Sequence, residues 1–330
     1  MGKSKNKKFK RPQFSAEGLP VSAVNDFQDE EEVDSPAGEL LEKLQSPCAD
    51  VREYACASIS RVVQQTQTIP AFLQRDAVRC LGPLLLDRSL PVRETAAGAL
   101  RNLSVCGGFE VCEDMVKQDI LTPLTALLRE CCTGFDTNSG LLPKSPKEQK
   151  NLVEAVANEA VNLLWNLCEC CSRALSVFNR AGLLEILIQC LDRHPHNMEL
   201  ALSAARCLHT VSEENTELLG TLNVAVLGAL ESVLLSSHPG MGHILLRTLT
   251  AGSVWNMKSC LPSDRQAQTL SALVATLSQS LEQDSGTLIP ALKEAETVQS
   301  TAVPTGAAGS ANGEEMEEME EEEEEEEEEG

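Results

Sequence analysis

A repeated sequence motif is the feature that most constrains the fold of this chain. Residues 92–98 (VRETAAG) match residues 51–57 (VREYACA) at an offset of about 41 residues. A third copy lies at residues 158–167, and two later copies end at residues 208–211 and 254–257. Periods of roughly 40 to 47 residues are typical of α-solenoids with two or three helices per unit. The period predicts one elongated repeat protein.

The spacing of apolar residues within residues 92–128 predicts the helices of one such unit. Apolar residues recur every three or four positions on both sides of Gly107 and Gly108, which is the spacing of a helical face. The two glycines interrupt this pattern and predict a break in the helix. Because a unit this short cannot bury its apolar face alone, it needs copies stacked against it. The expected fold class is an all-α, armadillo/HEAT-type right-handed solenoid.

The most apolar text of the later units lies at residues 183–188, 224–230 and 270–277. We expect these three segments to form the hydrophobic seam of the repeats. Aromatic residues make up 3% of the chain, so the core is expected to be aliphatic.

Composition divides the chain into five parts. Residues 1–36 read as a disordered head that is first basic and then acidic. Residues 37–285 hold about five repeats, with a polar loop inserted at residues 133–150. Residues 286–313 form a linker rich in small residues, and residues 314–330 form an acidic tract.

The text of the units and of the chain ends resembles a known family. Residues 99–103 (ALRNL), a glycine break and residues 120–128 (ILTPLTALL) resemble an armadillo repeat, whose three helices stack around a groove. Together with the head at residues 1–14 and residues 293–297 (KEAET), they resemble the symportin family of armadillo/HEAT proteins. Members of that family continue beyond the acidic tract into further HEAT repeats. The resemblance implies an N-terminal portion or a short form of such a protein.

The acidic tract dominates the charge of the chain. The formal net charge is -23, and fourteen of the carboxylates lie at residues 314–329. Such a run repels itself and attracts basic proteins over a Debye length of about 8 Å at physiological salt. The alternative is a tail that only increases solubility. The candidate site for basic cargo comprises Glu314, Glu315, Glu317, Glu318, Glu320, Glu321, Glu325 and Glu329.

The head carries a candidate nuclear import signal. A short basic run fits the acidic groove of an import receptor as an extended peptide, and the alternative is a solvated tail that touches RNA phosphates. The symportin resemblance implies a Pro-Tyr type signal here, but the text after Arg11 lacks that pair. The basic residues of the run are Lys3, Lys5, Lys7, Lys8, Lys10 and Arg11.

A second candidate site is the groove expected along the repeats. In armadillo units an Asn near the end of the inward-facing helix can hydrogen-bond the backbone of an extended peptide. The importin-alpha pattern places Trp four residues before Asn, where this chain has Gly98, Asn162 and Gly252. The alternative is that the Asn residues cap helices and the Trp residues fill the core. The candidate groove residues are Arg101, Asn102, Trp165, Asn166, His209, Thr210, Trp255 and Asn256.

The sequence offers no pattern for catalysis or for a cofactor. It lacks phosphate-binding glycine loops, nucleophile elbows and metal-ligand spacings. The cluster of Cys168, Cys170 and Cys171 reads as buried thiols in preference to a metal site, because a helix points these side chains in different directions. No apolar run reaches the roughly 18 residues of a membrane span, so no membrane partner is expected.

These patterns favour a non-enzymatic protein. The symportin resemblance implies a chaperone that carries basic ribosomal proteins of the 5S particle to the nucleus with an importin-beta class receptor, shuttling between cytoplasm and nucleus. It implies that the acidic tract and the groove bind cargo, with no sequence-specific contact to nucleic acid. The alternative is a general helical scaffold, or an importin-alpha-like adaptor whose acidic tail acts as a histone chaperone.

Overall fold

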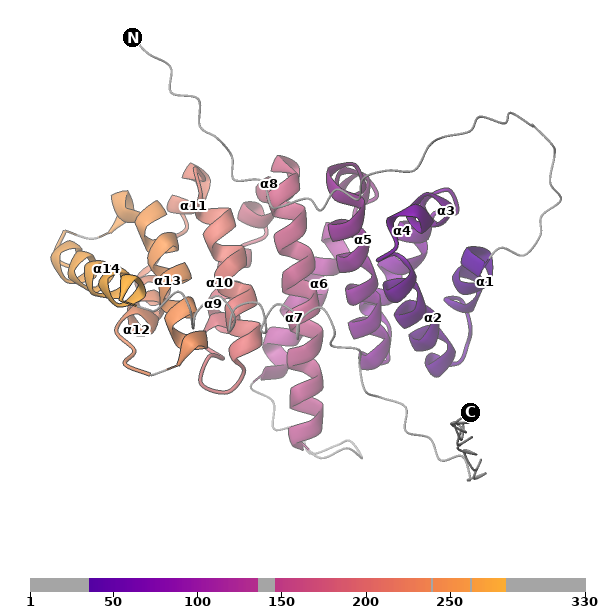
Figure 1. Cartoon of the computed structure of the whole chain (residues 1–330), viewed down its shortest axis with the longest axis horizontal. Coiled ribbons are helices and arrows are strands. Elements are labelled where there is room, and N and C mark those ends of the chain that lie inside the picture. The colour runs from indigo at the N-terminus through magenta and orange to yellow at the C-terminus, as the bar shows by residue number, and fades with distance from the viewer. Residues whose placement is uncertain (1–35, 136–145, 239, 262, 283–330) are drawn as a thin grey trace, which may run out of the picture.

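The computed structural model describes residues 36–135, 146–238, 240–261 and 263–282. In these ranges all regular secondary structure is helical, and the units follow one another along a single axis (Figure 1). The all-α solenoid predicted from the period is therefore confirmed. The predicted linker and acidic tract, and the predicted head up to residue 35, lie outside the described residues.

The helices repeat in a regular order. Short 3-10 helices at Thr66–Thr68, Gly82–Leu86 and Lys258–Cys260 join some of them. The α-helices are α1 (Pro36–Lys43), α2 (Ala49–Val62), α3 (Ile69–Leu73), α4 (Ala77–Leu81), α5 (Leu90–Lys117), α6 (Leu121–Phe135), α7 (Pro146–Cys170), α8 (Ser172–Arg180), α9 (Leu183–Leu191), α10 (Met198–Ser212), α11 (Thr216–Leu219), α12 (Val224–Leu234), α13 (Met241–Asn256) and α14 (Gln266–Leu281).

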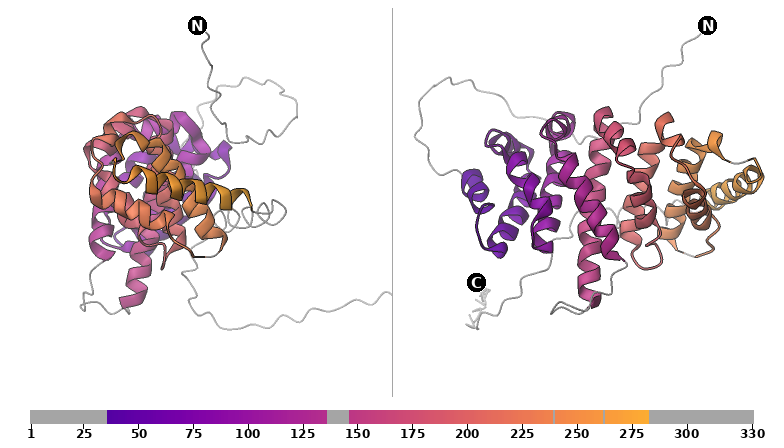
Figure 2. Two further views of the ribbon diagram at one scale, coloured as in Figure 1. Left: turned by 90° about the vertical axis from the view of Figure 1, so that its left-hand side faces the viewer. Right: turned by 180° about the vertical axis from the view of Figure 1, so that it is seen from behind.

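The long helices form two rows. Helices α2, α5, α7, α10 and α13 lie side by side, each packed on the next, and we call them the inner row (Figure 1). Helices α6, α9 and α12 form a second row behind them, α14 packs on α12 and α13 at the end of the solenoid, and the short helices lie along one edge. Views from the end and from behind show the same order of units along one axis (Figure 2). Each unit thus contacts mainly its two neighbours.

The predicted break in residues 92–128 is confirmed. Helix α5 kinks at Gly108, where φ is 68° and ψ is −154°. A residue with a Cβ atom rarely adopts this conformation, so glycine is required. The kink turns the chain from the inner row to the edge of the solenoid.

The loop predicted at residues 133–150 is shorter than expected at both ends. Residues 133–135 belong to α6 and residues 146–150 belong to α7. Residues 136–145 lie outside the described part of the chain.

One aliphatic core runs through all units. Its largest fully buried side chains include Leu100, Leu103, Leu124 and Phe178. Buried alanines on the inner row, such as Ala96, leave room for neighbouring helices to approach closely. The expectation of an aliphatic core is confirmed.

The predicted hydrophobic seam is confirmed for two of the three segments. All the apolar residues of α9 are buried, and most of those of α12 are. The prediction is wrong for part of α14, where Leu270, Val274 and Leu277 are exposed. The reason is positional, because no described unit follows α14 to cover its second side.

Ion pairs also join the units. Arg52 of α2 pairs with Asp87 at 2.8 Å, and Glu154 of α7 pairs with Arg193 at 2.6 Å. Glu154 is only 4% exposed and also accepts a hydrogen bond from Asn197 at 3.1 Å. A buried carboxylate is tolerated only when it is paired in this way.

No single helix in the described ranges is long and apolar enough to cross a membrane. Helices α8 and α9 reach the length and composition only as a pair, and they are bent by 85° relative to each other.

We predict that Glu154→Ala lowers the free energy of unfolding by about 3 kcal/mol, because it leaves the guanidinium of Arg193 without its buried partner. Urea unfolding followed by circular dichroism measures the change. Glu113→Ala, which removes the exposed pair with Lys117, is the matched control and should have little effect. Equal effects of the two variants would contradict the role given to Glu154.

Candidate functional site

The predicted groove residues lie on the inner row, and three of them form an inter-unit hydrogen-bond ladder. Asn102 donates to the Ser60 carbonyl at 2.9 Å and to its Oγ at 2.8 Å. Asn166 donates to Ser104 Oγ at 2.9 Å, and Asn256 donates to Ser212 Oγ at 3.1 Å. In each case the amide belongs to one unit and the acceptor to the unit before it.

The exception in the fourth unit has a physical cause. Thr210 stands where the other units have Asn, and Cys168 stands in the preceding unit where a serine acceptor is needed. Since a thiol is a weak acceptor, an Asn at this position would lose its partner. Thr210 Oγ1 instead accepts a hydrogen bond from Trp165 Nε1 at 2.8 Å. The text N-x-S, at residues 102–104, was the sequence signal for this ladder.

The ladder uses donors that a peptide ligand would need. Asn102 and Asn166 are only 8% and 7% exposed, and Asn102 donates to two acceptors on Ser60. Neither the proposed peptide contacts nor the proposed helix capping by these Asn residues is tested by this geometry. The predicted peptide contacts of the groove stay a prediction.

The residues before the ladder positions differ in exposure. The Arg101 side chain is bound to Glu159, with Nε and Oε2 2.6 Å apart. His209 packs over Gly252, where an added Cβ would lie 2.6 Å from the imidazole ring. Trp255 is 54% exposed, and Lys258 Nζ lies 4.4 Å from its ring centroid. The face of Trp255 therefore already attracts a cation, as a cation–π site does.

A row of carboxylates on the inner helices was missed by the sequence reasoning. Burial, then repulsion from Glu159 and Glu53, raises the pKa of Glu94 to about 7. Burial likewise raises the pKa of Glu159, with a further contribution from Glu199, although Arg101 opposes the shift. Glu53 and Glu94 occupy the same place in the two VRE copies, which was a usable signal. We call Glu53, Glu94, Glu159 and Glu199 the acidic row.

The acidic row is held in place by neutral neighbours. Asn158 Nδ2 donates to Glu199 Oε1 at 2.9 Å. Gly98 lies beside Glu159, and a Cβ added at Gly98 would meet Glu159 Oε2 at an ordinary contact distance of 3.5 Å. Of the four carboxylates, Glu159 has an arginine partner in the structure. The repulsion among Glu53, Glu94, Glu159 and Glu199 indicates that these carboxylates of α2, α5, α7 and α10 lie near one another.

The described residues hold no group of three or more His, Cys, Asp or Glu side chains that could bind a metal ion. Cys168 is buried, and burial raises the pKa of its thiol to about 12. Three histidines do cluster where α13 begins: the His238 and His243 rings stack at 5.0 Å, and His194 lies 6.3 Å from each. Stacked rings do not direct their nitrogens to a common metal.

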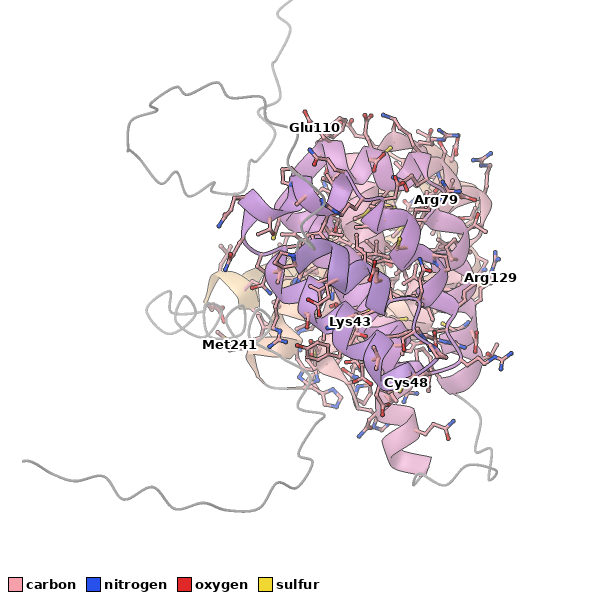
Figure 3. All side chains as sticks on the ribbon, turned by 90° about the vertical axis from the view of Figure 1, so that its right-hand side faces the viewer. Lys43, Cys48, Arg79, Glu110, Arg129 and Met241 are labelled. Atoms are coloured by element: carbon pink, nitrogen blue, oxygen red, sulfur yellow. The ribbon has the colours of Figure 1, made fainter. Side chains whose placement is uncertain are left out.

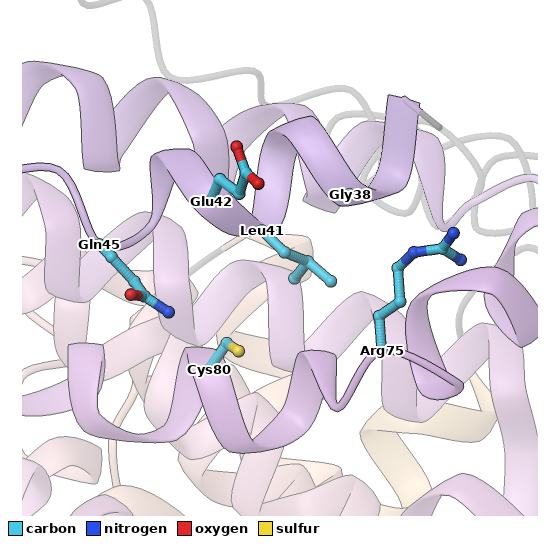
Figure 4. Close-up of a pocket in the computed structure, with 6 residues that line it drawn as sticks. All are labelled: Gly38, Leu41, Glu42, Gln45, Arg75 and Cys80. Carbon is cyan, nitrogen blue, oxygen red and sulfur yellow. The ribbon is translucent and has the colours of Figure 1, made fainter. Parts of the chain in front are cut away.

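A pocket of about 320 Å³ lies between α1 and α4 at the first end of the solenoid. Its lining residues are Gly38, Leu41, Glu42, Gln45, Arg75 and Cys80. The charged ends of Glu42 and Arg75 are turned away from Cys80 (Figure 4). The pocket therefore lacks the converging polar groups of a small-molecule site.

Comparison with known proteins places the chain among repeat proteins. The HEAT-like repeat family matches residues 49–103. HEAT repeat-containing protein 3 from Homo sapiens is 54% identical over 300 residues, which cover 90% of this chain and 44% of the human protein. By sequence, the chain is a relative of HEAT repeat-containing protein 3. The Mus musculus protein of that name is also 54% identical, over 301 residues, and the chain spans less than half the length of either relative.

A more distant relative carries a functional description. The armadillo repeat protein involved in nucleocytoplasmic transport Syo2, from Schizosaccharomyces pombe, is 28% identical over 187 residues. These residues cover 54% of this chain and 28% of Syo2. Together with HEAT repeat-containing protein 3, it confirms the resemblance drawn from the repeat text.

Solved structures confirm the armadillo architecture. A designed armadillo repeat protein aligns with a TM-score of 0.56 and 18% identity, over 79% of this chain and 98% of its own. Another, solved in complex with peptide (KR)4, aligns with a TM-score of 0.53 and 20% identity, over 81% and 93%. Repeat solenoids of this kind are typical of non-enzymatic proteins. The predicted import signal and acidic tract lie outside the described residues.

We predict that Asn166→Ala and Ser104→Ala are coupled. Because each change removes the same inter-unit hydrogen bond, the double variant should lose about 1 kcal/mol less stability than the sum of the single variants. Urea unfolding of the four proteins measures this coupling. A coupling near zero would mean that Asn166 contributes little to packing and is available to a ligand.

We predict that Glu94→Gln stabilises the fold at pH 8 and has little effect below pH 4.5. A raised pKa means that the folded state holds its proton more tightly, so the associated stability is present below the ordinary pKa and is lost as pH rises through about 7. Removing the charge should restore on the order of 1 kcal/mol at pH 8. The measurement is the urea midpoint across pH, with Glu113→Gln as the exposed control.

Proposed function

We propose that this chain is a non-enzymatic transport adaptor that binds basic protein segments along its inner row. The observation that carries the proposal is the acidic row, in which Glu94, Glu159 and their neighbours repel one another. A cationic ligand lying across α2, α5, α7 and α10 would relieve that repulsion. The exposed ring of Trp255 on α13 would extend the same surface for a Lys or Arg side chain.

The relatives also support a transport adaptor that binds basic segments. Syo2 is described as involved in nucleocytoplasmic transport, and one designed armadillo neighbour was solved with peptide (KR)4. The acidic tract adds fourteen carboxylates within residues 314–329. It would bind further basic surface of the same cargo and mask it from RNA.

The cargo we propose is the pair of ribosomal proteins that associate with 5S rRNA, carried from cytoplasm to nucleus for assembly of the large ribosomal subunit. One would lie on the inner row and the other on the acidic tract. The basic head, with Lys7, Lys8 and Lys10, would bind an import receptor of the importin-beta class. These assignments rest on the symportin resemblance and on the chemistry of the two acidic elements.

The test is a binding titration of purified 5S-associated ribosomal proteins and of histones, at low and at physiological salt. The titrated proteins are the whole chain, a chain ending at Gly313, and the variant Glu53→Gln with Glu199→Gln. Glutamine keeps the hydrogen-bond acceptor that Asn158 uses and removes only the charge. We expect the variant to bind one ribosomal protein about threefold to tenfold more weakly, and the shortened chain to lose affinity for the other.

The matched control is Glu110→Gln with Glu113→Gln, which removes two charges from the second half of α5. In an end-on view Glu110 lies at the upper edge, and Arg129 of α6 lies on the side away from Met241 of α13 (Figure 3). Equal losses of affinity in both double variants would mean that net charge alone, and not the position of the acidic row, determines binding. Histones that compete on equal terms would instead favour a general scaffold with a histone-chaperone-like tail.

A second readout concerns protons. Because a bound cation lowers the pKa of Glu94, ligand binding near pH 7 should release protons from the acidic row. Calorimetry in two buffers of different ionisation enthalpy measures this release, and Glu94→Gln should reduce it. Unchanged proton release in Glu94→Gln would place the ligand elsewhere.

A further inference from the structure

Arg101 places a positive charge of the chain itself within the acidic row. Glu94, Gly98 and Arg101 follow one another at steps of four and three residues in α5, so they lie on one side of that helix. Glu159 of α7 reaches this side: its Oε2 lies 2.6 Å from Arg101 Nε and would lie 3.5 Å from a Cβ atom added at Gly98. Burial, then repulsion from Glu159, raises the pKa of Glu94. The carboxylate that Arg101 binds is therefore one that acts on its neighbours in the row.

The ion pair of Arg101 with Glu159 is open to solvent and simply anchored. The two side chains are 26% and 21% exposed. Within the described part of the chain, the hydrogen bonds of the Arg101 guanidinium both go to Glu159, one from Nε at 2.6 Å and one from Nη2 at 3.4 Å. The second of these is longer than a typical N–H···O hydrogen bond. A ligand can therefore reach both partners of the pair.

Two other ion pairs between units are held more firmly. Arg52 donates from Nε and Nη2 to Asp87 at 2.8 and 3.0 Å, and from Nη1 to the Ser46 carbonyl at 2.7 Å. Arg193 and Glu154 bury their charges more deeply, with side chains that are 14% and 6% exposed. The pair between α5 and α7 has fewer bonds than the first of these and is more open than the second. It is the one that a ligand can exchange most readily.

The guanidinium of Arg101 stands where the cation of a basic ligand would bind. Burial raises the pKa of Glu159, and the positive charge of Arg101 opposes that rise, so a cation at this position stabilises the ionised carboxylate. A Lys or Arg side chain of a ligand would make the same contact only after Arg101 has left it. Breaking a partly exposed ion pair lowers the affinity of such a ligand by roughly twofold to fivefold.

We propose that Arg101 is an internal competitor, which occupies Glu159 in the free protein and which a basic segment displaces when it binds. The inference rests on the proposed function, because it takes the acidic row as the binding surface. A ligand with one cation gains little by replacing one guanidinium with another. A segment already held by Glu53, Glu94 or Glu199 presents its next cation to Glu159 at a high local concentration, so it can make the exchange. Arg101 therefore favours segments with several basic residues over isolated charges.

The test is the affinity of variants of the whole chain for the peptide (KR)4 at pH 8, above the pKa of about 7 of Glu94. We expect Arg101→Gln to bind the peptide about fivefold more tightly, because Glu159 is then available without an exchange. The matched control Lys117→Gln removes the same charge from an exposed pair with Glu113 on the second half of α5. It should change the affinity by less than about twofold.

The variant Glu159→Gln separates displacement from a general change of charge. Without this carboxylate Arg101 has no partner to leave, so adding Arg101→Gln to Glu159→Gln should change the affinity by less than about twofold. The variant Arg101→Lys keeps the charge but loses the fork of guanidinium donors, and it should bind the peptide with intermediate affinity. It provides the comparison if Arg101→Gln alone does not fold.

The proposal is overturned if neither variant of Arg101 binds the peptide more tightly than the unmodified chain. It is also overturned if Lys117→Gln gains as much affinity as Arg101→Gln, or if the gain persists in the presence of Glu159→Gln. The proposed function fails by a different result, in which Glu53→Gln with Glu199→Gln leaves the affinity for the peptide unchanged. A loss of affinity in that double variant without a gain in Arg101→Gln would keep the acidic row as the binding surface and reject the internal competitor.

Discussion

The structure depends on side chains that reach from one unit into the unit before it. Asn102, Asn166 and Asn256 each donate an amide proton to a serine of the preceding inner helix. Together with the close approach that small residues allow, these bonds join each unit to its neighbour at a defined position along the inner helices. Because a solenoid has contacts only between neighbours, the geometry of this local step sets the shape of the whole inner row.

Much of the fold follows from the sequence, and the reason is its repetition. The VRE copies and the apolar spacing give the helices, and Gly107–Gly108 give the kink in α5, because these are local properties of the chain. The partners of Asn166 and Glu159 lie 62 and 58 residues away. The N-x-S pattern marks the residue types of the ladder, but which units pair, and at what distance, depends on the rotation between units. The insertion between α6 and α7 also interrupts the period, so the repeat spacing does not give the separation of these partners.

The two acidic elements of the chain are physically different. The acidic row is held on rigid helices, where neighbouring carboxylates share one repulsive field and Glu94 holds its proton up to about pH 7. The tract at residues 314–330 is a run of charge whose text cannot bury an apolar face. A fixed row favours a ligand of matching spacing, whereas a charged run attracts basic surface of any shape. One chain can therefore combine selectivity with general shielding of charge.

The scarcity of aromatic residues has an optical consequence. The chain has two tryptophans, Trp165 on α7 and Trp255 on α13, and both belong to the inner row. One donates its indole proton to Thr210, while the other is largely open to solvent beside Lys258. The intrinsic emission of the chain therefore originates from the inner helices, from one sheltered and one hydrated indole. The wavelength and the quenching of this emission therefore report on the inner row without an added fluorophore.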